Sequence, residues 1–498
     1  MSYNPATGEE TGRYSNASAQ DILAAVGNLR RRSTLAAGLL WSELPLKKRI
    51  GFLSRLRSKL ASNADELAEL VSTEIGKPLQ EAYGADILPA LDAIDWLCKA
   101  APKHLRNKKI TRNAALIPEP LGVIGVIGTW NYPIFLNVIP IVWALMAGNS
   151  VVWKPSELAT ETALRLKTIF NELSLPVAVV LGDGTSGQAL CKAGCDKVVF
   201  TGGVATGRAI LQTLAEYGTP AVMELSGNDA MLVCKDADIP LAARSAVWGR
   251  CSSAGQSCVA PQRIYVDEKA LEEFLKECRH TMHSLVQGID FGPMRTFELR
   301  KRAETLVCQA IDEGAKLLVG GVSDKNTQGF FMSPTLLTCC CENSAILKQD
   351  FFGPVLAVQG FNSIDEAVRL ANGSEMGLGA SVWTEDEATG KRIAAAMKAG
   401  LVSINQILLD AADPALPFGG VGASGFGKQR GIAGLDEFVH WKAVATHSTR
   451  GERRHLFPHR AETVAILSGL IALKSEKGFA EKWNSMRALM SAVKDWKR

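Results

Sequence analysis

Residues 120–153 read PLGVIGVIGTWNYPIFLNVIPIVWALMAGNSVVW, and this stretch decides the fold class. It holds no charged residue and is long enough to span a bilayer. Glycine, asparagine and proline interrupt it at Gly122, Gly125, Gly128, Asn131, Pro133, Asn137, Pro140, Gly148 and Asn149. Such residues divide the stretch into strand, loop, helix, turn and strand, and uninterrupted apolar runs are also typical of buried parallel strands. The stretch therefore predicts a buried α/β core rather than a membrane helix.

The same rhythm continues along the chain. Short apolar runs predict strands over 121–127, 150–153, 177–181, 197–200 and 221–225, with helices over 134–146, 161–171, 186–192 and 205–215. Strands that alternate with helices in this way predict a parallel, doubly wound α/β sheet. Upstream, residues 17–100 are mostly helical in pattern, and Ser18 with Asp21 can form a capping box at the start.

Two other segments flank this sheet. Residues 102–120 are basic and irregular, and they predict a protruding hairpin. Residues 226–417 predict a second α/β segment, with helices around 240–249, 269–287 and 297–313 and strands near 316–319, 355–358 and 380–383. A chain of 498 residues has room for about three domains.

The composition excludes several classes of protein. Apolar residues make up 47% and charged residues 21%, which excludes a disordered chain. A net charge of +4 is close to balance, so we expect no nucleic-acid partner. The eleven cysteines show neither CxxC nor a zinc spacing, and residues 1–10 do not resemble a signal peptide. We therefore expect a reduced, cytoplasmic protein with no metal site.

Polar residues follow each predicted strand of the first sheet. Because ligands bind beyond the carboxyl ends of parallel strands, these residues predict a nucleotide site. They are Asn131, Lys154, Glu157, Gly182, Gly184, Thr201, Gly202, Gly203 and Glu224.

Each motif at these strand ends also has an ordinary structural interpretation. The GxGxxG pattern at 182–187 lacks the acidic residue expected about 20 positions later, so it can be a plain turn. The GGVATG stretch at 202–207 can bind a phosphate at a helix N-terminus, or it can also be a plain turn. Lys154 and Glu157 can be a surface ion pair, or they can bind a ribose, where Glu157 would favour NAD over NADP. Cys258 can be an inert cysteine or a nucleophile, and Glu224 a structural ion-pair partner or a general base.

Seven segments taken in order resemble the aldehyde dehydrogenase superfamily over about residues 1–447. They are TWNYP (129–133), KPSE (154–157), FTGGVATG (200–207), MELSG (223–227), GQSC (255–258), FFGPV (351–355) and PFGGVGASGFG (417–427). The resemblance implies that Cys258 is the nucleophile, Glu224 the base that activates water and Asn131 the oxyanion donor beside the Cys258 backbone N–H. It also implies cofactor contacts at Trp130, Lys154, Glu157, Gly202, Gly203, Gly207, Asp350 and Phe352.

The implied reaction oxidises an aldehyde to the carboxylic acid with NAD, or alternatively NADP. The Cys258 thiolate would form a thiohemiacetal and then a thioester, which Glu224-activated water would hydrolyse. The alternatives are a CoA-acylating or reductive oxidoreductase and a non-catalytic scaffold of the same fold. The aldehyde cannot be identified from the sequence: no arginine is recognisable as a carboxylate clamp, and Trp143, Trp248, Phe135 and Phe418 can line a tunnel or belong to the core.

This sequence departs from the family pattern at three positions. Asp350 replaces the usual glutamate and is one methylene shorter, so its ribose contact would be looser. Ser226 stands where glycine is usual, and it would be strained if that position required a positive φ. Gly203 stands where serine is common, which removes one hydroxyl that could bind a phosphate.

The resemblance also implies a domain organisation. Residues 1–101 and 121–225 would form a Rossmann-like NAD-binding domain, 226–417 the catalytic domain, and 102–120 with 418–449 a small bridging sheet for a homodimer or homotetramer.

Residues 450–498 lie outside the family pattern. They carry eleven Lys/Arg against five Asp/Glu, and the apolar run 464–473 is too short to span a bilayer. A helical stripe follows, made of Phe479, Trp483, Met486, Met490 and Val493. Such a helix suits peripheral contact with a membrane surface, and it equally suits packing on its own or a neighbouring subunit, which is the commoner use of an apolar stripe.

Overall fold

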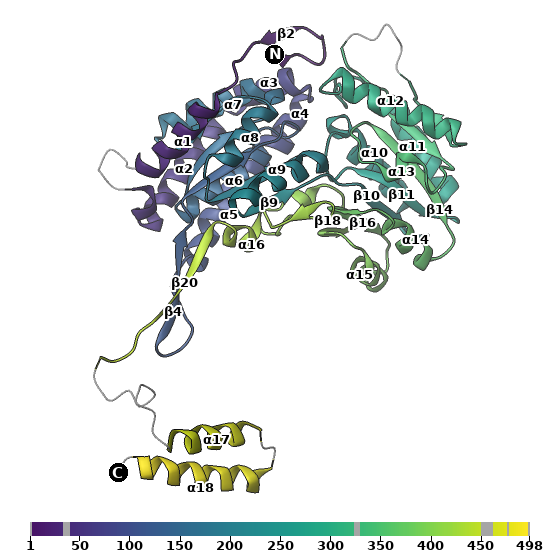
Figure 1. The fold of residues 1–498 in the computed structure, drawn as a ribbon. Helices are drawn as coiled ribbons and strands as arrows, with labels where there is room; N and C mark the ends of the chain where they lie inside the picture. Colours follow the sequence, from purple (N-terminus) through teal and green to yellow (C-terminus); the bar gives the residue numbers. More distant parts are fainter. Residues whose placement is uncertain (1, 33–39, 323–328, 450–461, 476–477, 497–498) are drawn as a thin grey trace. The chain divides into compact units, whose positions relative to one another are not determined.

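The computed structural model describes residues 2–32, 40–322, 329–449, 462–475 and 478–496 (Figure 1). These residues divide into two compact units. One unit is made of residues 1–108 and 116–442, and the other of 109–115 and 443–498. Two large sheets lie in the first unit.

The first large sheet has six strands in the order β19-β9-β8-β5-β6-β7, and all neighbours are parallel except β19 and β9. The strands are β5 (Val123–Ile127), β6 (Ser150–Lys154), β7 (Val177–Val179), β8 (Lys197–Thr201), β9 (Ala221–Glu224) and β19 (Gly425–Phe426). The five predicted strands and the doubly wound sheet are thus confirmed. The chain builds β5, β6 and β7 toward one edge and then β8 and β9 toward the other, so β5 and β8 flank the switch point where such sheets bind ligands.

Apolar side chains alternate between the two faces of this sheet. Ile124 and Val126 belong to one core cluster, whereas Val123 and Ile127 belong to another. The first face is covered by α2 (Leu46–Ser62), α3 (Ala64–Ile75), α5 (Leu88–His104), α6 (Phe135–Ala147) and α7 (Thr160–Glu172). The second is covered by α1 (Ala19–Arg32), α8 (Gly184–Lys192) and α9 (Val204–Tyr217). Every residue of α6 is buried, which explains why its sequence is as apolar as that of a membrane helix.

The predicted capping box is present at the start of α1. Asp21 N–H donates to Ser18 Oγ at 3.1 Å, and Ser18 N–H donates to Asp21 Oδ2 at 3.0 Å. The short helix α4 (Leu79–Glu81) and a π-helical turn over Ala82–Ile87 lead into α5.

A seven-stranded sheet forms the rest of the large unit, in the order β12-β13-β14-β11-β10-β16-β17. Its strands are β10 (Asp229–Val233), β11 (Pro261–Asp267), β12 (Lys316–Val319), β13 (Thr335–Thr338), β14 (Val355–Phe361), β16 (Gly379–Trp383) and β17 (Leu401–Ile404). The helices of this part are α10 (Ile239–Cys251), α11 (Leu271–Ser284), α12 (Phe297–Asp312), α13 (Ala345–Lys348), α14 (Ile364–Ala371) and α15 (Glu387–Ala396). The predicted second α/β segment is confirmed.

Small elements complete the described chain. They are β1 (Ser2–Tyr3), β2 (Glu10–Gly12), β15 (Met376–Gly377), β18 (Val421–Gly422) and α16 (Gly431–Asp436). A three-stranded sheet has the order β20-β4-β3, with β3 (Lys108–Lys109), β4 (Ala114–Pro120) and β20 (Val439–Ala445). Its strands come from the two segments predicted to form a bridging sheet, although residues 102–104 belong to α5 rather than to the hairpin.

Residues 462–475 and 479–496 are helical, and the second of these helices carries the predicted stripe. They form α17 (Glu462–Ser475) and α18 (Phe479–Trp496), which pack against each other with Gly469 beside Leu489. Residues 450–461 lie outside the described part of the chain. Among the described helices, none combines the length and the apolar character needed to cross a membrane.

Candidate active site

A cleft opens at the carboxyl ends of β5, β6 and β8, at the switch point of the six-stranded sheet. Its volume is about 520 Å³, and its lining includes Trp130, Lys154, Glu157, Gly202 and Gly203. Lys154 is buried and its Nζ lies 3.1 Å from Glu157 Oε2, whereas the Glu157 side chain is half-exposed. The two predicted ribose contacts therefore form an ion pair on the wall of a cleft and not on a featureless surface.

Both glycine-rich segments lie on this cleft. Gly184 and Gly187 line it together with Gly202 and Gly203. Helix α9 begins next to Gly203, so its unpaired N–H groups and positive dipole end are available to an anion there. No atom lies within 4 Å of the position that a Gly203 Cβ would take, so a ligand can approach the backbone closely.

Gly207 does not line the cleft. It is buried on α9, and an added Cβ would lie 2.5 Å from Leu225 Cδ2. The structure therefore gives this glycine a packing role between helix and strand, and the phosphate contact inferred from the motif does not follow from its position.

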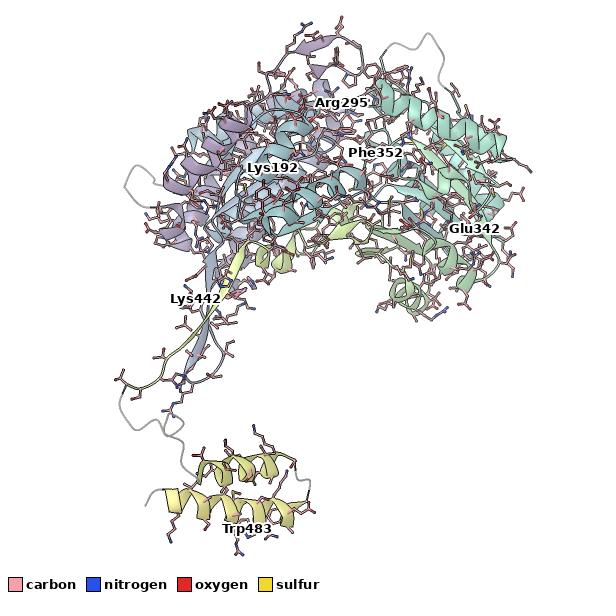
Figure 2. All side chains as sticks on the ribbon, viewed as in Figure 1. Lys192, Arg295, Glu342, Phe352, Lys442 and Trp483 are labelled. Carbon is pink, nitrogen blue, oxygen red and sulfur yellow. The ribbon has the colours of Figure 1, made fainter. Side chains whose placement is uncertain are left out.

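A second cavity of about 220 Å³ continues from the cleft toward Cys258. It shares Trp130, Gly202 and Gly203 with the cleft. Its lining also includes the predicted residues Asn131, Glu224, Cys258, Asp350 and Phe352. The ring of Phe352, labelled in Figure 2, meets the ring of Trp130 edge to face with centroids 5.6 Å apart. All predicted site residues except Gly182 and Gly207 therefore lie along one continuous depression.

Cys258 and Glu224 are in contact at the inner end of this depression. Cys258 Sγ lies 3.8 Å from Glu224 Oε1, and Glu224 Oε2 is buried without a hydrogen-bond partner. Burial raises the pKa of Glu224 to about 7, against the opposing effects of Arg430 and Cys258. Burial, and then the charges of Glu224 and Asp229, raise the pKa of the Cys258 thiol well above its usual range, while Arg430 opposes the rise. The carboxylate is thus placed and poised to exchange a proton near neutral pH.

The chain just before Cys258 is held in an unusual conformation. Ser253 and Ala254 have φ values of 51° and 53°, a region that such residues rarely occupy. Glu81 Oε2 accepts a hydrogen bond from Ser253 N–H at 2.7 Å. Strain of this kind persists only where the surroundings hold it, and it is often found at active sites.

The backbones of three family motifs, MELSG, GQSC and FFGPV, approach one another closely at glycine residues around Cys258. Gly255 has φ +70°, and a Cβ there would lie 2.1 Å from Gly353 O. A Cβ on Gly227 would lie 2.2 Å from Cys258 O. The MELSG, GQSC and FFGPV segments therefore need glycine because their backbones touch around Cys258.

Asn131 is held rigidly next to this loop. Its Nδ2 donates to Gln256 O at 2.9 Å, and its Oδ1 accepts from Thr129 Oγ1 at 2.9 Å. A primary amide has two N–H donors, so one is left for an oxyanion.

Two of the departures from the family pattern can now be located. Ser226 has no positive φ, and its carbonyl accepts from Ser424 Oγ at 2.6 Å, so the strain considered for this position is absent. Asp350 lines the inner cavity, and its Oδ1 lies 3.8 Å from Arg302 Nη2.

A third cavity, of about 340 Å³ and mostly apolar, reaches Cys258 and Glu224 from another direction. Trp248, Phe135 and Phe418 line it, as the tunnel interpretation predicts. Trp143 does not: it is fully buried, and its Nε1 donates to Gly431 O at 3.2 Å, so it belongs to the core.

The sequence did not indicate several charged residues around the site. Lys77 and Asp86 form a fully buried ion pair at 2.7 Å, and Asp86 also accepts from the N–H groups of Ile134 and Phe135 at the start of α6. Lys77 Nζ lies 3.5 Å from the ring centroid of Tyr132. Within a helical stretch such charges look solvent-exposed, and no local signal distinguishes them. Arg430, which lines the apolar cavity, was missed for the same reason.

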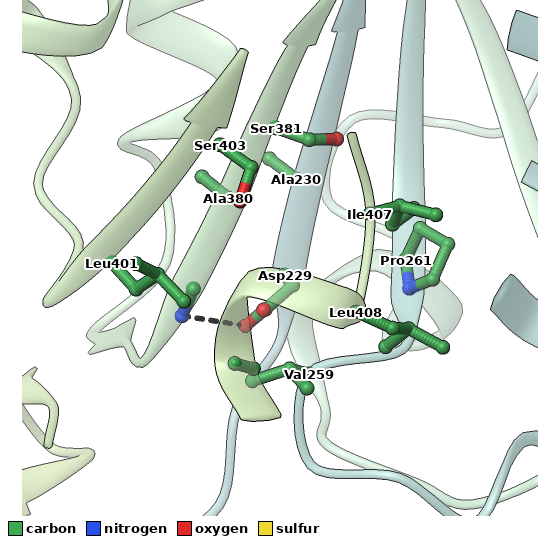
Figure 3. Close-up of a pocket in the computed structure, with 12 residues that line it drawn as sticks. Asp229, Ala230, Val259, Pro261, Ala380, Ser381, Leu401, Ser403, Ile407 and Leu408 are labelled. Carbon is green, nitrogen blue, oxygen red and sulfur yellow. Dashed lines mark hydrogen bonds between the residues drawn. The ribbon is translucent and has the colours of Figure 1, made fainter. Parts of the chain in front are cut away.

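A fourth, very small cavity is lined by Val259, the residue after Cys258, together with Asp229 and Pro261 (Figure 3). Its volume is about 20 Å³, which is room for little more than one water molecule. Asp229 there accepts a hydrogen bond from Gly379 N–H at 3.1 Å, and burial raises the pKa of its carboxyl to about 7. This cavity is a packing defect and does not have the size of a substrate site.

Comparison with known proteins agrees with this geometry. The Aldehyde dehydrogenase family matches residues 1–444. A 4,4'-diapolycopene aldehyde oxidase of Methylomonas sp is 33% identical over 92% of this chain and 93% of that protein. The chloroplastic betaine aldehyde dehydrogenase of Amaranthus hypochondriacus is 32% identical over 90% and 93%, respectively.

Solved structures agree as well. The aldehyde dehydrogenase of Mycobacterium tuberculosis complexed with NAD+ is 31% identical, with a TM-score of 0.85 over 90% of this chain and 95% of that chain. With a family match across both sheets and relatives of this similarity along most of its length, the chain belongs to the aldehyde dehydrogenase family of oxidoreductases.

Proposed function

We propose that this protein oxidises an aldehyde to the carboxylic acid with NAD, by way of a thiohemiacetal and a thioester on Cys258. The observation that carries the proposal is the contact of Cys258 Sγ with Glu224 at 3.8 Å, where the nucleotide-sized cleft and the apolar cavity meet. A nucleophile at such a junction has access to a cofactor from one side and to a substrate from the other.

The first step makes the thiolate. Glu224 is the acceptor in contact with Sγ, so it takes the thiol proton, and the thiolate attacks the aldehyde carbon. Asn131 Nδ2 and the Cys258 backbone N–H donate to the oxyanion that forms. Donors held in advance around a developing charge are worth several kcal/mol, typically about 3 or 4 for one of them.

The second step releases the acid. With a pKa of about 7, Glu224 loses the proton it took from the thiol at neutral pH and is ready to act again. It then removes a proton from the water that attacks the thioester, and Cys258 leaves as the thiolate.

The cleft residues fit a dinucleotide. Lys154 and Glu157 would hold the adenosine ribose, the start of α9 with Gly202 and Gly203 the phosphates, and Asp350 with Phe352 the nicotinamide ribose. When bound, NAD+ supplies the hydride acceptor that turns the thiohemiacetal into the thioester. The complex of the Mycobacterium tuberculosis relative with NAD+ supports this choice.

We propose an uncharged, largely apolar aldehyde as the substrate. The cavity wall is mainly aromatic and aliphatic. The relative named for diapolycopene aldehyde supports an apolar substrate, whereas those named for betaine aldehyde and aminoaldehydes have cationic ones. Aliphatic, aromatic, ω-carboxy and amino aldehydes assayed with NAD and NADP would rank these classes.

We also propose that the protein forms homodimers or homotetramers through the β20-β4-β3 sheet. Exposed Ile110, next to β3, and Val444, on β20, support this, since a small sheet of three strands is stable only when its apolar side chains are covered. Sedimentation of the full chain would test it.

Exchange of Cys258→Ser tests the proposed reaction directly. Because a hydroxyl is a far poorer nucleophile than a thiolate at neutral pH, NADH formation should disappear while NAD binding persists. Calorimetric titration with NAD provides the control for folding. Retained dehydrogenase turnover in this variant would falsify the assignment and point to another thiol, such as Cys251.

A further inference from the structure

Arg430 is held in the apolar cavity by its neighbours on both sides. Gln429 N–H donates to Phe418 O at 2.9 Å, and Gln429 Nε2 donates to Thr201 Oγ1 at 2.9 Å, at the end of β8. Gly431 O accepts the indole N–H of Trp143. The backbone at Arg430 is therefore tied to the six-stranded sheet and to α6, and its side chain cannot drift toward solvent.

The Arg430 guanidinium is buried without a direct partner. The residue is 2% exposed. Its guanidinium carbon lies 4.2 Å from the ring centroid of Phe418 and 5.2 Å from that of Phe135. Its Nε is buried without a hydrogen-bond partner, and no ion pair of Arg430 occurs within the described ranges. A buried, unpaired charge is costly, so its retention calls for an explanation.

The charges around Cys258 and Glu224, here called the catalytic pair, explain why this buried charge is retained. Cys258 faces the carboxylates of Glu224, at the end of β9, and Asp229, at the start of β10, with Tyr132 as a further titratable neighbour. Arg430, just before α16, is the cation that acts on both Cys258 and Glu224, and Asp413 also acts on Arg430. The pair carries one negative charge throughout the proton transfer, first on the Glu224 carboxylate and then on the Cys258 thiolate, and a buried charge is costly without a cation nearby.

We propose that Arg430 is a positioning residue for the reaction, whose buried charge stabilises the negative charge that Glu224 and Cys258 exchange. The inference rests on the proposed function, since it assumes that Cys258 is the nucleophile. The two aromatic rings hold the guanidinium in the field of the pair and exclude the water that would weaken it. Because Arg430 Nε has no hydrogen-bond partner in the described structure, its charge is available to the pair whichever of the two residues holds the proton.

Alkylation of Cys258 measures this field without cofactor or turnover. The rate of Cys258 carboxamidomethylation by iodoacetamide would be followed from pH 6 to 10 by peptide mass spectrometry in the full chain. The variants are Arg430→Met, which removes the charge, Arg430→Lys, which keeps it, and Arg430→Gln, which serves if the methionine variant does not fold. Arg244→Met, on the exposed side of α10, is the matched control.

The expected result is a shift of the alkylation midpoint to higher pH by about one unit in Arg430→Met and Arg430→Gln. Arg430→Lys should stay within about half a unit of the parent, and Arg244→Met should superimpose on it. At pH 7.5, kcat for hexanal should fall about tenfold in the methionine variant with KM little changed.

Two results would overturn the proposal. One is an alkylation profile that does not shift in Arg430→Met, together with an inactive Cys258→Ser variant. This result would keep Cys258 as the nucleophile and refute only the role of Arg430. The other is a rise in KM confined to ω-carboxy aldehydes, which would make Arg430 a substrate clamp. An active Cys258→Ser enzyme would instead refute the proposed function itself.

Discussion

Glu224 illustrates how function opposes stability at a single residue. It is fully enclosed, one of its oxygens has no partner, and burial raises its pKa from 4.5 to about 7. A carboxylate in such a place is tolerated because its chemistry needs it close to Cys258 and able to titrate near neutral pH. From the sequence, Glu224 can be either a general base or a structural ion-pair partner. The described structure contains no ion pair of Glu224, which favours the general base.

Glu224→Gln should separate the two halves of the reaction. The amide cannot take a proton from water, so hydride transfer should continue until the thioester accumulates. About one equivalent of NADH per active site should then appear as a burst, and the steady-state rate should fall about 100-fold or more. Rapid-quench or stopped-flow measurement of NADH gives both numbers. An unchanged steady state would show that another group activates the water.

The same variant should be more stable than the parent at alkaline pH. The pKa of Glu224 is higher in the folded than in the unfolded state, so the parent loses stability as pH rises from about 4.5 to about 7, while glutamine loses none. The shift corresponds to about 3 kcal/mol at pH 8 and to almost nothing at pH 4.5. Thermal unfolding of both proteins across this range would measure the difference, and equal melting temperatures at pH 8 would contradict it.

At the scale of elements, the residues at and just after the carboxyl end of strand β6 bear on the choice between NAD and NADP. Lys154 ends the strand and is buried, whereas Glu157 follows the strand and is half-exposed. The two residues form an ion pair on the cleft wall. Neither residue could be assigned from its own position in the sequence, because a Lys-x-x-Glu pair is usually a surface feature. The parallel sheet makes the difference, since it brings the ends of β5, β6 and β8 to one edge.

Glu157→Gln should relax the preference for NAD. The carboxylate would lie close to a 2′-phosphate, and its removal should raise kcat/KM for NADP relative to NAD by about tenfold, after allowance for the half-exposed side chain. Initial rates with both cofactors provide the test, with the Cys258 alkylation rate as the control for an intact site. A parent enzyme that already uses NADP as well as NAD would refute the assignment.

At the scale of the whole molecule, the helices α17 and α18 belong to the second compact unit, whereas the catalytic residues belong to the first. The two helices pack on each other and still leave large apolar side chains exposed. These include Val464, Leu467, Ile471, Phe479, Trp483 and Met490. The Phe479 and Trp483 rings stack with centroids 6.4 Å apart, with Trp483 labelled in Figure 2. An exposed apolar surface of this size is typical of a contact surface.

Deletion of residues 450–498 should therefore lower the melting temperature or change the oligomeric state, because we expect this surface to pack on the same or a neighbouring subunit. The catalytic residues all lie before residue 450, so turnover per active site should persist. Sedimentation and thermal unfolding of both proteins would test this. Binding of the full chain to anionic vesicles, absent after deletion, would instead favour the membrane-surface interpretation.

The sequence by itself determined those features that depend on local pattern. Alternating apolar runs gave the strands and helices of the first sheet, because strand and helix periods differ and glycine and proline mark the breaks. Parallel strands bring their carboxyl ends together, so the polar residues after each strand indicated the cleft. The family motifs then singled out Cys258 and Glu224, which the structure brings into contact.

Only the tertiary structure decided which charged residues are buried. Arg430 and the Lys77–Asp86 pair have no periodic or motif signal, because burial of a charge depends on which distant elements pack around it. The same reason separates Trp143, in the core, from Trp248, on the cavity. Local pattern shows what a segment prefers, whereas the field at Cys258 is a sum over residues as distant in sequence as Glu224 and Arg430.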